Sequence, residues 1–284
     1  MAYVHYPIGL LTYRMDTRAN EQKKDDGSWT TEFAVEKSEL SATGRNSYFI
    51  LEPGYQLVFE GGKERLVITV LDETKLVDGV ETRVVEERET KDGKLIEVSR
   101  NYFAISRRTN DVFYFGEDVD IYKNEKVVSH SGAWLAGVKG ARFGLMMPGE
   151  VRLKARYYQE IALGVAMDRA EIVSLSETVK TRAGEFKNCL KVEETIPLEP
   201  GVKEYKYYAA GVGLVQDGSL KLVKYGFARV KRSGARRRPA PLLQRSTRHH
   251  LMLILTLLAA RPSTINTTST SPRPIRLRGR PTLI

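Results

Sequence analysis

The sequence predicts an all-β protein whose main domain is a curved antiparallel meander, forming an open barrel or a sandwich. Three observations support this fold class. Short runs rich in β-branched and aromatic residues recur through residues 46–226. Turn dipeptides such as Asp78-Gly79 and Asp92-Gly93 separate these runs. No stretch of ten or more residues in this region keeps the 3.6-residue apolar spacing of an amphipathic helix.

Strands are expected in two groups, divided by an irregular stretch at 131–150. Within each group the turns are short, so each strand should pair with the one before it. So many consecutive strands exceed what a flat sheet usually holds, and the sheet should therefore curl. The first group spans 56–60, 66–72, 82–90, 95–106, 112–122 and 125–130, and the second spans 153–162, 170–181, 185–196, 203–209, 213–217 and 220–225.

The expected strand 153–162 illustrates how one face of the sheet should meet the core and the other should meet water. Apolar and polar residues alternate along it, as expected for a half-buried strand. The side chains predicted to face the core are Leu153, Ala155, Tyr157 and Ile161.

Charge divides the chain into a weakly patterned segment at 1–45, the β domain at 46–226 and a basic tail at 227–284. The tail holds 13 Lys or Arg and no Asp or Glu, whereas the rest of the chain holds 32 basic and 35 acidic residues. Such an abrupt change in residue usage is typical of translation in a different reading frame, and it predicts a disordered tail. The alternative is a genuine phosphate-binding arm, with Arg229, Arg232, Arg236, Arg237 and Arg238 binding nucleic acid.

Neither a membrane span nor an export signal is visible in the sequence. The apolar run 251–260 has about half of the ~20 residues that a spanning helix needs. The first 15 residues lack a basic start and a continuous apolar stretch, so taken literally the chain is cytoplasmic. Cys189 is the only cysteine, which excludes an internal disulfide and a cysteine-cluster metal site.

Four runs carry a resemblance to a known group of proteins: SYFILEPGYQLVFEG (47–61), VSRNYFAISRRTNDVFYFGEDVD (98–120), GEFKNCLKVEETIPLEPG (184–201) and YYAAGVGLVQDG (207–218). In these runs the chain resembles a family of uncharacterised, generally exported bacterial β-sheet proteins, and it is distantly similar to LolA-like lipoprotein carriers. The resemblance implies a curved antiparallel sheet with an apolar concave face. It also implies a periplasmic or secreted location, and it brings no activity with it.

Catalytic and cofactor motifs are absent from the sequence: it holds no Gly-x-Ser-x-Gly elbow, no Walker loop and no His-Glu-x-x-His, and no cofactor is expected. Clustered carboxylates are the remaining chemical signal. Glu117, Asp118 and Asp120 are weak candidates for a cation site. Asp168 with Glu160 or Glu171 is a candidate carboxylate pair for a hydrolase.

A further carboxylate cluster on the expected strand 82–90 indicates cross-strand ion pairs. Glu86, Glu87 and Glu89 alternate there with Arg88.

The irregular stretch 131–150 is apolar and rich in glycine, which is unusual for a loop in water. Two interpretations follow: a mobile lid over an apolar cavity, or a plug that fills one end of the barrel. The lid interpretation predicts a set of candidate ligand-binding residues, which are Trp134, Phe143, Met146 and Met147 from the stretch and Phe113, Phe115, Tyr157 and Tyr207 from the strands. Under the plug interpretation the apolar side chains are simply packed core.

The sequence thus favours a non-enzymatic envelope protein that binds an apolar or lipid-like ligand, or a partner protein, on its curved sheet. Two alternatives remain open: a hydrolase that uses the clustered carboxylates, and nucleic-acid binding through the Arg-rich tail. Nucleic acid is the less favoured partner because the body of the chain is slightly acidic.

Overall fold

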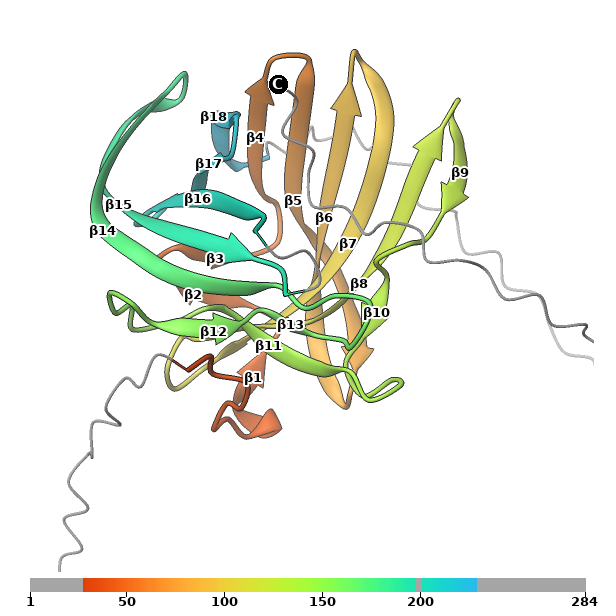
Figure 1. The fold of residues 1–284 in the computed structure, drawn as a ribbon, viewed down its shortest axis with the longest axis vertical. Helices are drawn as coiled ribbons and strands as arrows, with labels where there is room; N and C mark the ends of the chain where they lie inside the picture. Colours follow the sequence, from red (N-terminus) through yellow and green to blue (C-terminus); the bar gives the residue numbers. More distant parts are fainter. Residues whose placement is uncertain (1–27, 198–200, 229–284) are drawn as a thin grey trace, which may run out of the picture.

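A long antiparallel sheet winds almost into a closed barrel in the computed structural model, which describes residues 28–197 and 201–228 (Figure 1). The predicted fold class is confirmed, and of its two forms the barrel is the one observed. No α-helix occurs among these residues; a single turn of 3₁₀ helix, η1 (Lys37–Glu39), precedes the first strand.

The first group of strands contains three short elements and then a long meander. The short elements are β1 (Leu40–Ser41), β2 (Gly44–Asn46) and β3 (Phe49–Leu51). The meander consists of β4 (Tyr55–Gly61), β5 (Glu64–Val77), β6 (Val80–Lys91), β7 (Lys94–Ser106), β8 (Val112–Lys123) and β9 (Lys126–Ser129). Each of these six strands overlaps a predicted strand.

Four short strands follow, and then a second meander. The short strands are β10 (Trp134–Leu135), β11 (Arg142–Met147), β12 (Arg156–Tyr158) and β13 (Glu160–Ile161). The meander consists of β14 (Arg169–Thr181), β15 (Gly184–Thr195), β16 (Lys203–Ala209), β17 (Gly213–Asp217) and β18 (Leu220–Phe227). Its strands agree closely with the predicted ones.

The two meanders are joined into a barrel at two junctions. At one junction β18 pairs antiparallel with β4, placing Phe227 opposite Tyr55. At the other, β8 pairs with β11 and β11 with β13, while β14 pairs with β12. The two ends of the sheet are therefore β12 and β13, which flank Gln159. We call residues 142–169, where these ends meet, the seam.

Hairpin turns agree with the local sequence. Asp78 and Gly79 adopt φ values of 49° and 76°, and Asp92 and Gly93 adopt 51° and 75°. Two successive positive φ angles are typical of the tight turns that match strand twist, and Asp-Gly tolerates them well. These turns fix the register of the residues next to them, and register shifts at Val70–Thr74 and Glu89–Thr90 reset it toward the middle of the strands.

Two expectations about the second third of the chain are corrected. The stretch 131–150 is neither a free lid nor a plug, because β10 and β11 pair with β8 and form part of the wall. The expected strand 153–162 is divided into β12 and β13, and Leu153 is 53% exposed instead of facing the core. Tyr157 and Ile161 are buried as expected.

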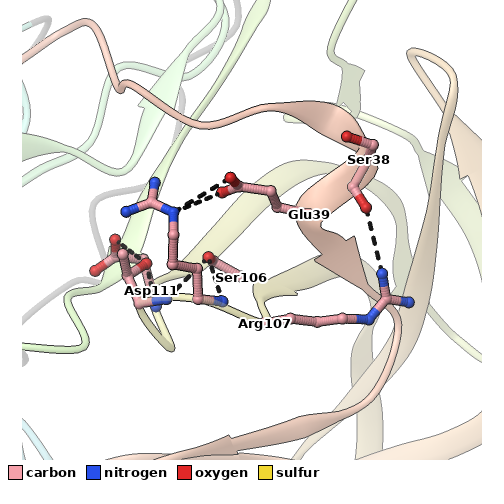
Figure 2. A network of polar contacts seen from close by, with 7 residues as sticks. Ser38, Glu39, Ser106, Arg107 and Asp111 are labelled. Atoms are coloured by element: carbon pink, nitrogen blue, oxygen red, sulfur yellow. Dashed lines mark hydrogen bonds and ion pairs between the residues drawn. The ribbon is translucent and has the colours of Figure 1, made fainter.

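Residues 28–45, assigned above to a separate weakly patterned segment, contact the barrel at the β7–β8 turn. Leu40 of β1 pairs with Ser106, and Phe33 packs edge-on against Phe113 at 5.9 Å. The Arg107 amide donates to the Glu39 carbonyl at 2.9 Å. Figure 2 shows the polar network that joins Ser38 and Glu39 to this turn, with Ser106 and Asp111 capping it from within. This segment therefore covers one end of the barrel.

Two further features expected from the sequence concern residues outside the described ranges. The Arg-rich part of the tail and the apolar run 251–260 both lie there, as do the first 27 residues. Within the ranges that are described, no helix has the length and apolar composition needed to span a lipid bilayer.

Candidate functional site

The barrel encloses a cavity of about 760 Å³, which we call the acidic cavity. Its lining comes from β5 to β8 on one side, from β15 and β16 on the other, and from the seam between them. The lining extends to Glu64 and Lys91, beside the β4–β5 and β6–β7 turns, which lie at the top of Figure 1. The cavity therefore runs from the interior toward the end opposite the N-terminal segment.

Inward-facing side chains of β5, β6 and β7 are arranged in cross-strand layers. The deepest layer pairs Val70 with Val85, and Val85 with Asn101. The next joins Ile68, Glu87 and Ser99, and the outermost joins Leu66, Glu89 and Glu97. Because side chains alternate along a strand, this register places an increasingly acidic lining toward the open end.

A smaller apolar pocket of about 90 Å³ adjoins the deep end of the acidic cavity. Tyr55, Leu57, Ile68 and Val70 line it from β4 and β5. Both spaces share four lining residues, which are Glu87, Phe103, Met146 and Lys206. A single ligand can therefore contact both.

Carboxylates outnumber basic groups in the acidic cavity by eight to three. The acidic residues are Glu64, Glu87, Glu89, Glu97, Glu117, Glu160, Asp168 and Glu194. The three basic residues each face a carboxylate: Arg65 lies 2.6 Å from Glu60, Lys91 lies 3.1 Å from Glu64, and Lys206 lies 2.6 Å from Glu194. The positive charge of the lining is thus already compensated.

Two of the carboxyl groups hold their protons unusually tightly. Burial, followed by the charges of Glu87 and Glu97, raises the pKa of Glu117 to about 8, although a hydrogen bond from Tyr114 opposes the shift. Burial and the neighbouring Asp168 and Glu117 raise the pKa of Glu160 well above its usual range. At neutral pH the protonated form of Glu117 is therefore favoured.

Backbone hydrogen bonds of the seam bring Glu160 and Asp168 into the cavity. The Asp168 carbonyl accepts from the amides of Gln159 at 2.7 Å and Glu160 at 3.2 Å. The Gln159 side chain donates to Glu194 at 3.0 Å, which ties the seam to β15. Of the candidate pair partners of Asp168, Glu160 is the one that shares the cavity. Glu171 instead pairs with Arg156 at 2.8 Å.

Of the eight predicted ligand-binding residues, only Met146 lines either space. Phe113 and Phe115 alternate with the cavity-lining Tyr114, so they face away from the cavity, and Phe143 stacks on Phe115 at 4.9 Å. Trp134 is 6% exposed and meets the Tyr114 ring edge-on at 5.5 Å.

The other three predicted residues also belong to the packed wall. Met147 and Tyr157 are buried. Tyr207 is half-buried beneath the Lys191 ammonium, which lies 5.6 Å from the ring. Their apolar character indicates packing in this barrel, and it does not mark the cavity.

The three candidate metal ligands are not brought together. Glu117 lines the cavity, whereas its neighbour Asp118 accepts a hydrogen bond from Lys75 at 2.9 Å outside it, and Asp120 lies 2.9 Å from His130. Alternation along β8 separates Glu117 from the other two. Within residues 28–197 and 201–228, no group of three or more His, Cys, Asp or Glu side chains is suited to hold a metal ion.

Sequence reasoning missed the acidic lining, although one signal for it was present. Glu86 pairs with Arg100 of β7 at 3.3 Å, which is the cross-strand ion pair expected, and it also lies 3.6 Å from Arg88 on its own strand. Glu87 and Glu89 face the cavity instead. Glu87 and Glu89 follow Val85 at steps of two residues, so all three side chains lie on one face of β6. Once this face is known to line the barrel, the pattern indicates an acidic interior.

The site thus combines a cavity that opens at one end of the barrel, an apolar deep end and a lining with excess carboxylate. It is equipped to bind a small molecule, and its protonated carboxyl groups are equipped to donate protons. Comparisons with protein-family models, with curated proteins and with solved structures found no match.

Proposed function

We propose that this protein is a non-enzymatic binding protein that holds a small organic molecule inside its barrel. The supporting observation is the cavity of about 760 Å³ joined to an apolar pocket. Ligand sites in proteins commonly measure roughly 300 to 1,000 Å³ and combine apolar surface with a few polar groups. A partner protein is the weaker alternative, because the concave face of the sheet lies inside the barrel.

The resemblance to exported bacterial proteins supports two further parts of this proposal. It favours an apolar or lipid-like component in the ligand, which the apolar pocket can accommodate. It also favours a location in the bacterial envelope, which fractionation of cells that express the native gene would test.

Binding of the neutral fluorophore N-phenyl-1-naphthylamine provides the test of cavity binding. We expect a saturable rise in its fluorescence with one site per chain. A Ser99→Phe variant should weaken binding about ten-fold or more, because Ser99 is a buried residue of the cavity lining and the ring would occupy the ligand volume.

Ser176→Phe is the matched control, since Ser176 is exposed on β14. It should bind the fluorophore as the unaltered protein does, and thermal melting would show that both variants fold. Equal binding by Ser99→Phe and Ser176→Phe would place the fluorophore outside the cavity and refute the proposal.

A hydrolase is the second candidate, and the convergence of Glu117, Glu160 and Asp168 in one cavity favours it. A protonated carboxyl group beside a second carboxylate is the arrangement that acid–base hydrolysis requires. Incubation with a panel of p-nitrophenyl glycosides and esters would test it. Turnover that disappears in both Glu160→Gln and Asp168→Asn would favour catalysis over simple binding.

A further inference from the structure

The charge of the lining is informative about the ligand, because the cavity is poorly suited to an anion. Each basic lining residue already has a carboxylate partner within 3.1 Å. Lys206, the base at the boundary with the apolar pocket, is held by Glu194, whose other oxygen accepts from Gln159. A bound carboxylate or phosphate would have to break these pairs and approach the remaining acidic residues.

Aromatic rings provide an independent observation that points to a cation. Phe103 and Tyr114 both line the acidic cavity, and their rings stack with centroids 4.6 Å apart. Glu87 and Glu117 line the same cavity, where they pair with Ser99 and Asn101, the inward-facing residues that precede Phe103 on β7. Aromatic rings and carboxylates in one lining are an environment that stabilises an ammonium group in proteins.

The apolar pocket directly adjoins the part of the cavity that holds these rings and carboxylates. Glu87 and Phe103 line both spaces, so a charged group beside them lies next to the surface formed by Tyr55, Leu57 and Val70. The pocket is small, which limits the apolar part of a ligand to a short chain or a single ring. Both ends of the site therefore fit one short amphipathic molecule.

The carboxyl groups of this part of the cavity favour protonation, because burial and neighbouring carboxylates raise the pKa of Glu117 and of Glu160. The groups that face Glu117 are Glu87 on β6, Glu97 on β7, Tyr114 on β8, and Glu160 and Asp168 at the seam. Their mutual repulsion is relieved by protonation, and an organic cation would relieve it in the same way. Binding of a cation should therefore displace protons from the cavity.

We infer that the ligand is an organic cation, a protonated amine or quaternary ammonium with a short apolar group, whose charge lies among Glu87, Glu117 and Glu160 beside the Phe103 and Tyr114 rings. The apolar group extends into the pocket lined by Tyr55 and Leu57. This inference rests on the proposed binding function, and it adds the chemical class of the ligand.

Three ligands that share a phenyl ring and differ in charge test the inference: benzyltrimethylammonium, its neutral carbon analogue neopentylbenzene, and phenylacetate. Each is titrated against protein loaded with N-phenyl-1-naphthylamine. We expect the cation to displace the fluorophore at a concentration at least ten-fold lower than either of the others does. A Glu117→Gln/Glu160→Gln double variant should lose about ten-fold in affinity for the cation and retain its affinity for the neutral ligand.

Asp118→Asn is the matched control, because Asp118 neighbours Glu117 in sequence but lies outside the cavity; it should leave all three affinities unchanged. Retained fluorophore binding shows that each variant keeps its cavity. Equal or tighter binding of the neutral or anionic ligand, or no loss in the double variant, would overturn the cation inference and leave the binding function intact. The binding function itself would be overturned if the fluorophore did not bind, or if it bound to Ser99→Phe as tightly as to the unaltered protein.

Discussion

The β4–β8 meander and the seam both form the barrel wall, but local turn residues determine the structure of the meander and long-range contacts determine that of the seam. In the meander, each strand is joined to the next by a short turn whose residues suit the observed backbone, as at Asp92-Gly93. In the seam, the wall depends on close approaches between distant backbones. A Cβ added at Gly144 would lie 2.3 Å from the Gln159 carbonyl oxygen, and one at Gly149 would lie 1.8 Å from that of Thr109. The meander is specified locally, whereas the seam is specified by long-range contact.

The largest effect should come from Gly144→Ala in the seam. Its added methyl group would meet three backbone atoms of Tyr158 and Gln159 within 2.6 Å, and a backbone cannot move aside as a side chain can. We expect a loss of roughly 3 to 5 kcal/mol in the free energy of unfolding, measured by urea titration. Gly79→Ala in the meander is the comparison. Nothing lies within 4 Å of its added Cβ, so only the strain at φ 76° remains, at about 1 kcal/mol. Equal losses would remove the distinction between the two regions.

Glu117 and Asp118, neighbours on opposite faces of β8, should respond to pH with opposite signs. Because burial and nearby carboxylates raise the pKa of Glu117 to about 8, its stabilising contribution is complete below its usual pKa near 4.5 and is lost as pH rises through 8. Glu117→Gln should therefore exceed the unaltered protein in free energy of unfolding at pH 9, by on the order of 2 kcal/mol, with the difference shrinking toward pH 5.

For Asp118 the burial that would raise the pKa is outweighed by hydrogen bonds from Lys75 and Tyr102, so the pKa is lowered. Asp118 therefore stabilises the fold at neutral pH, and this contribution disappears as pH falls through the lowered pKa. Asp118→Asn should be less stable than the unaltered protein at pH 7 and should match it in acid. Urea titrations at several pH values check both variants, and effects of the same sign would contradict the assignment of faces.

The smallest contrast concerns two buried tyrosines. The Tyr157 hydroxyl, in the seam, has no hydrogen-bond partner among the described residues, whereas the Tyr55 hydroxyl donates to the Val212 carbonyl at 2.8 Å. Removing an unsatisfied buried hydroxyl should help, and removing a satisfied one should harm. We expect Tyr157→Phe to raise the free energy of unfolding by about 1 kcal/mol and Tyr55→Phe to lower it by about as much. Melting temperatures shifted a few degrees in opposite directions would show this.

Much of the fold could be predicted from the sequence, because strands and hairpin turns are determined by signals within a few residues: the alternation of apolar and polar side chains, and the turn dipeptides. Strands β4 to β9 and β14 to β18 were predicted for this reason. Strands β10 and β11 were not, since they lie in the glycine-rich stretch 131–150, whose sequence carries no strand signal. The site was harder still. Phe113 and Phe115 suggested a ligand surface but pack away from the cavity, and Glu87 and Glu89 suggested surface ion pairs but line it. Alternation divides residues into two faces without saying which one encloses the cavity.

The pairing of β18 with β4 has a consequence for how the chain reaches this structure. Strand β4 pairs with β5 on one side and with β18, the last strand, on the other, where Tyr55 lies opposite Phe227. A ribosome must therefore release almost the whole domain before the ring can close, and until then β4 and β17 each present an unpaired edge to other chains. Contacts so distant in sequence slow folding, because the entropy of loop closure is lost before the pairing compensates for it. The half-made barrel, with its edges open, is the form most at risk of aggregation during synthesis.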